Sequence, residues 1–397
     1  MTSDNSFGHE LKMKRETYGI SQNKLAVTAG LSRQYINDIE NSKKIPTKET
    51  KDRILKALEK FNPESPMYIL IDYVRIRFPT CNLKHVIEDI LKINISYMQY
   101  EARGMFGYSA RYFIGDVIVL TSPDETKGIL LELRGHGCRQ FESYLLAQER
   151  SWNDFLAACL DSGAIMKRLD LAINDCTGIL DIPELVRKCN NDECVGIFRS
   201  FKSYASGELV SRMEEDRERM GNTLYIGSLK SDVYFCIYEK DYEQYLKNDI
   251  PLEEAEVKNR FEIRLKNERA YYTVVDLLAY EDVDETVFGI INHYMRFVDK
   301  REDVEKESWE LNERWSYFIG EGRRSIKLTT KPEPYTIDRT VKWLRKQVDS
   351  TLLMLEKVKE KGGFDYLEEI CKTTELKDKH KAIIKQLTTP VENIVLN

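Results

Sequence analysis

The sequence contains no apolar run that approaches the roughly 18–20 residues a helix needs to cross a bilayer. Its first residues, MTSDNSFGHELKMKRE, also lack the apolar centre of a secretory signal peptide. We therefore expect a cytoplasmic protein that does not insert into a membrane. Internal repeats and low-complexity segments are absent too, which argues against a repeat architecture or a disordered chain.

Histidine and paired cysteine are scarce. The five histidines are never close in sequence, and none of the eight cysteines forms a CxxC pair. Zinc sites usually draw on closely spaced ligands of these two types, so the sequence argues against a zinc site. In a cytoplasmic chain the scattered cysteines are expected to be reduced and to serve mainly in packing.

Charge is distributed unevenly along the chain. The 397 residues are 42% hydrophobic and 32% charged, which is enough for two or three folded domains. The net charge is −6, but residues 1–62 hold twelve Lys/Arg and eight Asp/Glu, so this segment is +4 and the remainder is −10. Since binding to nucleic acid depends on the local basic surface, the overall negative charge does not exclude it.

The N-terminal segment has the layout of a helix-turn-helix. Gly30 supplies a tight turn after the helical run SQNKLAVTA, and Ser32 can cap the next helix, SRQYINDIENS. Ile36 and Ile39 of that helix would face the core. Over residues 1–62 the arrangement resembles the Cro/repressor family of helix-turn-helix domains, which implies that the capped helix enters the major groove. A small helical packing module with solvated charges is the alternative.

Exposed positions of the capped helix and of the turn after it are the candidates for DNA contact. Long polar side chains can hydrogen-bond base edges, and lysines can bind phosphates. The candidates for base edges are Arg33, Gln34, Tyr35 and Asn37, and the candidates for phosphates are Lys43 and Lys44.

The middle of the chain has mainly strand patterns. Alternating apolar and polar residues predict strands at MYILIDYVRIRF and KGILLELR, and a strand pair over 107–120. Amphipathic patterns predict one helix over 139–156 and a long helix over 336–361. The expected fold class is therefore multidomain: an all-α helix-turn-helix domain, then an α+β domain built on a largely antiparallel sheet, with a helical C-terminal region.

Two strand-like runs between residues 223 and 266 carry the candidate chemistry. In the first, VYFCIYEK, a period of two puts Tyr238 and Lys240 on one face. A tyrosine with an ordinary pKa near 10 is a poor nucleophile at neutral pH, but a nearby lysine and a divalent cation would favour the phenolate. The alternative is a charged sheet face with a surface tyrosine, since the chain has 22 tyrosines.

Carboxylates beside arginines form the second part of this chemistry. In NRFEIRLK, Glu262 shares a strand face with Arg260 and Arg264. In MKRLDLAIND, Asp170 shares a face with Arg168. Each carboxylate is either half of a structural ion pair or a metal ligand beside arginines that clamp a phosphate. These patterns alone do not decide between the two.

Five ordered motifs carry a family resemblance: LRGHGCRQFE, RLDLAIND, LYIGSLKSD, CIYEKD and RFEIRLK. With these motifs the chain resembles the replication initiation factor family of Gram-positive plasmids and conjugative elements. With the helix-turn-helix included, it resembles the relaxases of Gram-positive conjugative transposons. The resemblance implies a helix-turn-helix DNA-binding domain at 1–62, a catalytic replication-initiation or relaxase domain at 68–300, and a mostly helical region at 301–397.

The family resemblance implies an enzyme that nicks and rejoins DNA at an origin of transfer or replication, specifically for site and strand. A tyrosine of the family forms a covalent 5′-phosphotyrosyl link, and Mg or Mn assists as the divalent cation. Carried onto this sequence, the catalytic residues are Tyr238, Lys240 and, as the second choice of nucleophile, Tyr225; the metal ligands are Asp170, Glu262 and Glu142; the phosphate-binding residues are Arg168, Arg260, Arg264 and Arg139.

The chain departs from related patterns at two points. Where the family often has two consecutive acids, this chain has Asn174 and Asp175, so position 174 is left out of the metal set. The His-hydrophobe-His motif of other relaxases is absent. A metal would therefore be held mainly by carboxylates, which suits Mg or Mn.

The resemblance further implies DNA as the main partner, both as duplex and as single strand at an origin of transfer. It also implies the element's integrase, a helicase and a coupling ATPase as partners in conjugative transfer and rolling-circle replication. The alternative function is a helix-turn-helix transcriptional regulator whose C-terminal domain senses a ligand or oligomerises without catalysis. The N-terminal segment alone favours the regulator, whereas the ordered motifs favour the enzyme.

Overall fold

The computed structural model describes residues 7–8, 11–12, 15, 21–41, 43–59, 66–207, 219–280, 282–320, 326 and 328–396. The chain folds into two compact units. The first unit comprises Met1–Leu70, Leu171–Arg264 and Ala279–Thr329, and the second comprises Ile71–Asp170, Leu265–Leu278 and Thr330–Asn397. The division runs across strands, so each unit contains part of the main sheet.

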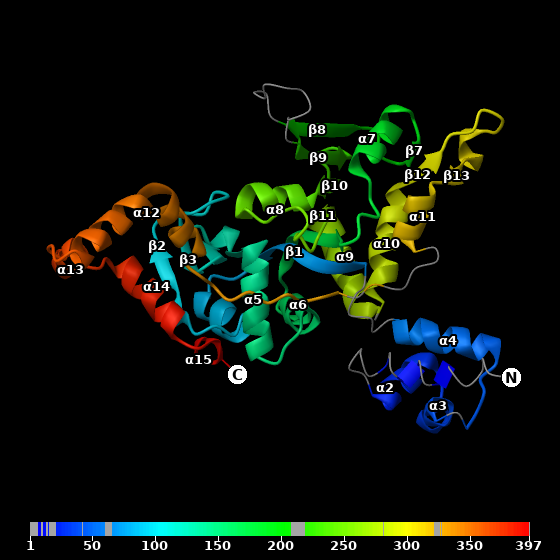
Figure 1. The fold of residues 1–397 in the computed structure, drawn as a ribbon, viewed down its shortest axis with the longest axis horizontal. Helices are drawn as coiled ribbons and strands as arrows, with labels where there is room; N and C mark the ends of the chain where they lie inside the picture. The colour runs from blue at the N-terminus through cyan, green and yellow to red at the C-terminus, as the bar shows by residue number, and fades with distance from the viewer. Residues whose placement is uncertain are drawn as a thin grey trace. The chain divides into compact units, whose positions relative to one another are not determined.

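A ten-stranded sheet forms the framework (Figure 1). Its strands follow the order β2-β3-β4-β5-β1-β6-β11-β10-β9-β8. The pairs β2/β3, β3/β4, β4/β5, β1/β5, β8/β9 and β9/β10 are all antiparallel, as the alternating patterns predict. In chain order the strands are β1 Met67–Phe78, β2 Gln99–Glu101, β3 Ala110–Ile114, β4 Val117–Thr121, β5 Ile129–Arg134, β6 Ile165–Asp175, β8 Phe201–Gly207, β9 Arg219–Ile226, β10 Val233–Glu239 and β11 Asn259–Lys266.

The N-terminal helices form the predicted helix-turn-helix. The Ser32 hydroxyl accepts a hydrogen bond from the Tyr35 backbone N–H at 3.2 Å and so caps the second helix of the motif. Gly30 has a φ of +63°, a left-handed conformation that favours glycine in the turn. Ile36 and Ile39 are buried, as expected. The helices are α2 Gln22–Ala29, α3 Arg33–Glu40 and α4 Lys48–Glu59.

Two helices of the second unit replace the single helix predicted over 139–156. The first, α5 (His136–Ala147), ends before Glu149, whose φ of +54° is not helical. The second, α6 (Trp152–Asp161), begins with a capping box in which Ser151 and Asp154 bond each other's backbone. The amphipathic pattern therefore continues across a helix boundary that periodicity alone does not reveal.

A small three-stranded sheet of the first unit is tied to a helix by a buried lysine. Lys188 lies on α7, and its ammonium group donates to Glu193 at 2.8 Å, to the Val298 carbonyl at 2.8 Å and to Asp299 at 2.6 Å. These three acceptors offset the cost of burying the charge. The strands follow the order β13-β12-β7. The elements are α7 Ile182–Asn190, β7 Cys194–Gly196, β12 Met295–Asp299 and β13 Glu310–Leu311.

Helices dominate the C-terminal region, as predicted. The long helix expected over 336–361 is present as α12 (Asp338–Glu360). The fold class is thus confirmed: helix-turn-helix helices, an α+β part on an antiparallel sheet, and C-terminal helices. The remaining helices are α8 Lys240–Asn248, α9 Asn267–Ala279, α10 Val283–Tyr294, α11 Glu313–Ile319, α13 Tyr366–Thr373, α14 Asp378–Thr388 and α15 Val391–Ile394.

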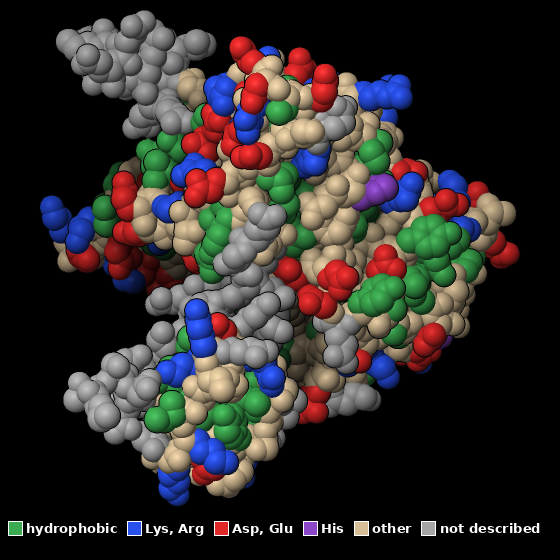
Figure 2. Space-filling view, turned by 90° about the vertical axis from the view of Figure 1, so that its right-hand side faces the viewer, with side chains coloured by type: hydrophobic (Ala, Val, Ile, Leu, Met, Phe, Trp, Pro, Cys, Tyr) green, Lys and Arg blue, Asp and Glu red, His purple; other side chains and the backbone are tan. Residues whose placement is uncertain are grey.

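The surface is mixed in charge. Figure 2 shows Lys and Arg side chains interspersed with Asp and Glu over the face that it draws. Among the residues with described positions, no helix combines the length and the apolar character needed to span a membrane.

Candidate active site

Tyr238 lies next to the last residue of β10 and contacts a carboxylate of the neighbouring strand β11. Its hydroxyl donates a hydrogen bond to Oε1 of Glu262 at 2.8 Å. Only 4% of Glu262 is exposed, whereas Tyr238 is half-buried. A phenol hydrogen-bonded to a buried carboxylate has a proton acceptor in place, which is one way to activate an oxygen nucleophile.

Arg264 holds the other oxygen of the same carboxylate. Its Nε and Nη2 donate to Glu262 Oε2 at 2.9 and 2.7 Å. Burial alone would lower the pKa of Arg264, but the Glu262 carboxylate raises it above its ordinary value, so the guanidinium stays charged. The two strands thus bring together Tyr238, Glu262 and Arg264, three of the predicted site residues, as one hydrogen-bonded group.

Lys240 does not lie on the strand face where the period of two predicted it. It is the first residue of helix α8, and its backbone N–H bonds the Lys258 carbonyl at 2.7 Å. Its ammonium group pairs with Glu243 and lies 5.6 Å from the centre of the Tyr238 ring. Burial would raise the pKa of Glu243, but Lys240 and Lys247 lower it to about 2, so this pair is ionised at neutral pH. Lys240 therefore lies near Tyr238, as expected, but from the start of helix α8 and not from the strand face.

Tyr225, the second choice of nucleophile, is less suited to ionise. It lies on β9 opposite Cys236 of β10. Burial, and then Cys236, raises the pKa of Tyr225 to about 12. Its ring packs edge-on against Tyr204, with 5.9 Å between the ring centres. A raised pKa makes the Tyr225 phenolate scarcer at neutral pH, and the choice between Tyr225 and Tyr238 as nucleophile stays a prediction.

In the second unit, Arg168 and Asp170 form the ion pair that their spacing on β6 predicts. Arg168 donates to the two carboxylate oxygens at 2.8 and 2.6 Å. Its guanidinium also stacks on the Tyr73 ring, 3.9 Å from the ring centre. Asp170 is buried, whereas Arg168 is half-buried.

A cluster around Glu132 was not predicted from the sequence. This fully buried carboxylate accepts hydrogen bonds from Tyr73, Arg75 and Arg134. Burial, and then Glu132, raises the pKa of Tyr73 to about 12. In the sequence, Tyr73 and Arg75 alternate along one predicted strand, and Glu132 and Arg134 alternate along another. The cluster depends on the pairing of these two strands, which the alternation does not reveal.

The described carboxylates do not form a ready metal centre. Within the described part of the chain, no group of three or more His, Cys, Asp or Glu side chains could hold a metal ion. The predicted ligands Asp170 and Glu262 belong to different units, and each is engaged by an arginine of its own strand. This donor set does not fit an Mg or Mn site as it stands, and we derive no step through a metal.

Glu142, predicted as a metal ligand, and Arg139, predicted as a phosphate contact, form a buried ion pair with each other. Glu142 is 2% exposed and accepts from Trp152 Nε1 at 2.9 Å and from the Lys331 N–H at 2.8 Å. Arg139 Nη2 lies 2.9 Å from Glu142 Oε1, and it also donates a hydrogen bond to the Ile71 carbonyl. Burial raises the pKa of Glu142. The pair joins α5, α6 and the segment after residue 330.

Replacing Glu142 with glutamine is expected to destabilise the protein by about 3–5 kcal/mol, because it leaves the buried Arg139 without a counter-charge. Urea or thermal unfolding measures the change. Glu184→Gln is the matched control, since it removes a half-buried glutamate paired with the exposed Arg187 at the same spacing and should change little. A Glu142→Gln variant of normal stability that needs more Mg or Mn for activity would instead support the predicted metal-ligand role.

Arg260, predicted as a phosphate contact, is buried and donates to Asn174 Oδ1 at 2.7 Å. Asp175 is fully buried and anchors the following loop through backbone N–H groups of Thr177, Gly178 and Leu180. Asn174 and Asp175 therefore fix β6 to its surroundings. This agrees with leaving position 174 out of the metal set.

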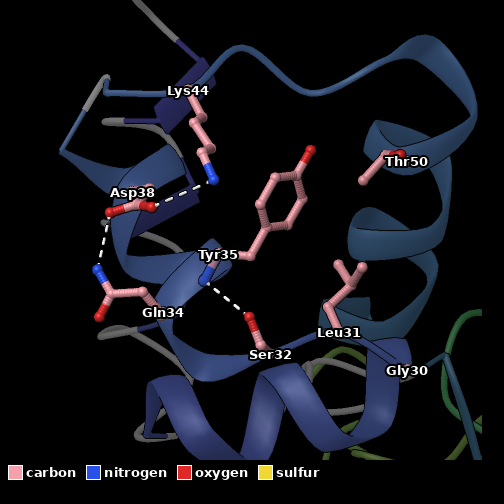
Figure 3. A pocket seen from close by; sticks show the side chains of 8 residues that line it. All are labelled: Gly30, Leu31, Ser32, Gln34, Tyr35, Asp38, Lys44 and Thr50. Atoms are coloured by element: carbon pink, nitrogen blue, oxygen red, sulfur yellow. Dashed lines mark hydrogen bonds and ion pairs between the residues drawn. The ribbon is translucent and has the colours of Figure 1, made fainter.

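The helix-turn-helix presents only part of its predicted DNA-reading set. Arg33 and Gln34 are exposed, and so are Lys43 and Lys44. Tyr35 is half-buried and lines a hollow beside α3 together with Lys44, whose ammonium lies 5.4 Å from the ring centre (Figure 3). Asn37 was predicted to be exposed but is half-buried. It faces α2, and its Oδ1 accepts a hydrogen bond from Gln22 at 3.3 Å.

Comparisons with known proteins agree with these elements. Residues 164–371 match the family described as "Replication initiation factor". Residues 68–158 match "Rolling Circle replication initiation protein N-terminal domain", and residues 11–60 match "Helix-turn-helix". These ranges include Tyr238 and Glu262 in the first match and α2 to α4 in the last.

Two individual proteins are similar over most of their length. "Putative DNA relaxase NicK" of Bacillus subtilis (strain 168) is 37% identical over 334 residues, which cover 84% of this chain and 93% of that protein. The solved structure of a rolling circle replication initiator protein from Geobacillus stearothermophilus has a TM-score of 0.52 and 24% identity. It covers 66% of this chain and 100% of its own, and this likeness concerns the fold alone.

Proposed function

Since the chain belongs to the replication initiation factor family, we propose that it nicks and rejoins DNA at an origin of transfer or replication, specifically for site and strand. The observation that carries this proposal is the hydrogen bond from Tyr238 to the buried Glu262 in the matched region. A tyrosine held against a proton acceptor is the chemistry that a covalent phosphotyrosyl intermediate requires.

The proposed step is a transesterification. The Tyr238 oxygen attacks the phosphorus at the nick site and forms a 5′-phosphotyrosyl bond, while the bond from phosphorus to the 3′ oxygen breaks. Glu262 takes the phenol proton, and the departing 3′ oxygen takes a proton from solvent to become a free 3′-OH. Glu262 then returns its proton to solvent. Joining is the reverse reaction. Glu262 thus acts as a general base in this proposal, in place of the metal ligand expected from sequence.

Two cations support this step. Arg264 orients the Glu262 carboxylate through two hydrogen bonds and leaves its other oxygen for the tyrosine. Lys240 lies beside the tyrosine ring, where its charge favours the developing phenolate. Lys240 is a positioning and electrostatic residue in this proposal.

The dependence on a divalent cation is a further part of the proposal. Mg or Mn would supply charge neutralisation on the scissile phosphate when bound. The integrase, helicase and coupling ATPase, and the cytoplasmic location, remain predictions.

The test uses supercoiled plasmid DNA that contains a transfer origin, incubated with the protein and either Mg or Mn. We expect a nicked circle with protein covalently attached to its 5′ end. EDTA is the control for the metal requirement. Absence of an adduct with every divalent cation tried would overturn the proposal and favour the helix-turn-helix regulator with a non-catalytic C-terminal part.

The domain division is proposed as well: residues 1–62 bind duplex DNA, 68–300 carry catalysis, and 301–397 form the helical region.

Arg33→Ala is then expected to weaken binding to the cognate duplex by about 1–3 kcal/mol, because an exposed arginine of α3 is lost. Cleavage of a single-stranded oligonucleotide should be unchanged. Fluorescence anisotropy measures binding, with Lys84→Ala in the second unit as the control. Equal loss of duplex binding and of single-strand cleavage would contradict the division.

A further inference from the structure

An aromatic side chain lies exposed on two arginines in the second unit. Phe106, in the loop between β2 and β3, is 49% exposed. Its ring stacks on the Arg75 guanidinium, 3.8 Å from the ring centre, and Arg134 lies 5.7 Å from the same centre. About half of Phe106 stays exposed although its ring is large and apolar, so packing against Arg75 accounts for only part of the ring.

The backbone at Phe106 is held in a conformation that phenylalanine rarely adopts. Its φ is +55°, in the left-handed region. The loop is fastened around it: Lys127 Nζ donates to the Gly107 carbonyl at 2.8 Å, and the Tyr108 hydroxyl donates to the Lys127 carbonyl at 2.9 Å. Strained positions that the surroundings fix in this way are concentrated at functional sites.

The arginines beneath the ring are fixed by a shared carboxylate. Glu132 is fully buried and bonds Arg75 at 2.6 Å and also bonds Arg134. One carboxylate thus serves two guanidinium groups, which leaves one positive charge beside the ring. Arg134 keeps 52% of its side chain exposed and can contact a solvent-borne anion.

We propose that Phe106, Arg75 and Arg134 form a binding site for an unpaired nucleotide of single-stranded DNA. The base stacks on the outer face of Phe106, whose inner face is backed by Arg75, and Arg134 binds the adjoining phosphate. Stacking on an exposed aromatic ring beside cations is how proteins hold single strands, whereas the bases of a duplex are not available to it. This inference rests on the proposed function, since it names a contact to the strand that the enzyme cuts.

The test measures single-strand binding by the full chain, with the Tyr238→Phe substitution present throughout so that cleavage does not interfere. Phe106→Gly is expected to weaken binding of a single-stranded oligonucleotide by about 5- to 100-fold, while binding of the matched duplex changes less than about twofold. Phe106→Trp should retain binding. Tyr100→Ala, which removes another exposed ring of the same unit, is the matched control.

Stability separates a binding role from a packing role. Glycine accepts a positive φ, so Phe106→Gly should leave the melting midpoint within about 2 °C of the parent or raise it. An oligonucleotide carrying 2-aminopurine at successive positions should show quenching at one position that this variant loses. Unchanged single-strand binding in Phe106→Gly, an equal loss of duplex binding, or failure of Phe106→Trp to retain binding would each overturn the inference.

The outcome is distinguishable from failure of the proposed function, because binding needs no covalent adduct. Single-strand binding that depends on Phe106, together with no adduct from the protein that retains Tyr238, would overturn the proposed function alone. Adduct formation with single-strand binding independent of Phe106 would overturn this inference alone.

Discussion

The Tyr238→Phe variant is expected to form no covalent DNA adduct, with the rate of its formation reduced by about 10³-fold or more. Removing the attacking oxygen leaves no group to form the phosphotyrosyl bond, and the loss of a nucleophile is among the largest single effects in enzymes. The measurement uses an oligonucleotide labelled downstream of the nick, because a 5′-linked fragment then carries its label into the protein band of a denaturing gel.

The control for this loss is Tyr225→Phe, which should keep the adduct because it retains Tyr238, the proposed nucleophile. Unfolding of Tyr238→Phe must also be measured, since the variant loses its hydrogen bond to Glu262. That loss costs about 1–3 kcal/mol, too little to explain a missing adduct by itself. An adduct that persists in Tyr238→Phe but disappears in Tyr225→Phe would move the nucleophile to Tyr225.

Local signals predicted the helix-turn-helix and most strands. Ser32 and Gly30 act through their immediate neighbours, as a cap and a turn, so their roles follow from the sequence around them. Strand patterns also identified which residues share a face, and the Arg168–Asp170 and Glu262–Arg264 pairs follow from that spacing. The families matched by the chain agree with the resemblance that the ordered motifs carry.

Burial and partners outside the strand were not predictable in the same way. Arg260 and Arg264 have the same spacing from Glu262, but Arg260 is buried against Asn174 on β6 while Arg264 binds the carboxylate. Glu142 is one turn from Arg139 as expected, but its burial depends on Trp152 and on Lys331, 189 residues away in sequence. Spacing gives the face of a side chain, and tertiary packing gives its role.

The contact between Tyr238 and Glu262 likewise depends on tertiary packing and not on the spacing within one strand. Both residues were selected from sequence, one as nucleophile and the other as metal ligand. Their hydrogen bond depends on the register between β10 and β11, which are separated by α8 and a loop in the chain. The two roles proposed for Glu262, proton acceptor or metal ligand, make different predictions.

The Glu262→Gln variant is expected to form the adduct about 10²- to 10⁴-fold more slowly at neutral pH, the usual contribution of a general base. Glutamine can still accept the hydrogen bond from Tyr238 but cannot take its proton, so positioning is kept while proton transfer is lost. Single-turnover adduct formation measures the rate. Arg264 loses its counter-charge in this variant, so its unfolding must be compared with that of the parent protein.

The pH dependence distinguishes a base from a metal ligand. A phenol ordinarily ionises near pH 10. Without a general base, the rate is therefore limited by the small fraction of Tyr238 that is ionised at neutral pH. The rate of Glu262→Gln should then rise about tenfold per pH unit from neutral pH toward about pH 9.5, and approach that of the parent protein, whose rate depends less on pH. If Glu262 were a metal ligand, higher Mg or Mn would restore the variant and alkaline pH would not. Restoration by metal alone would therefore contradict the general-base assignment and return Glu262 to the role that its sequence predicted.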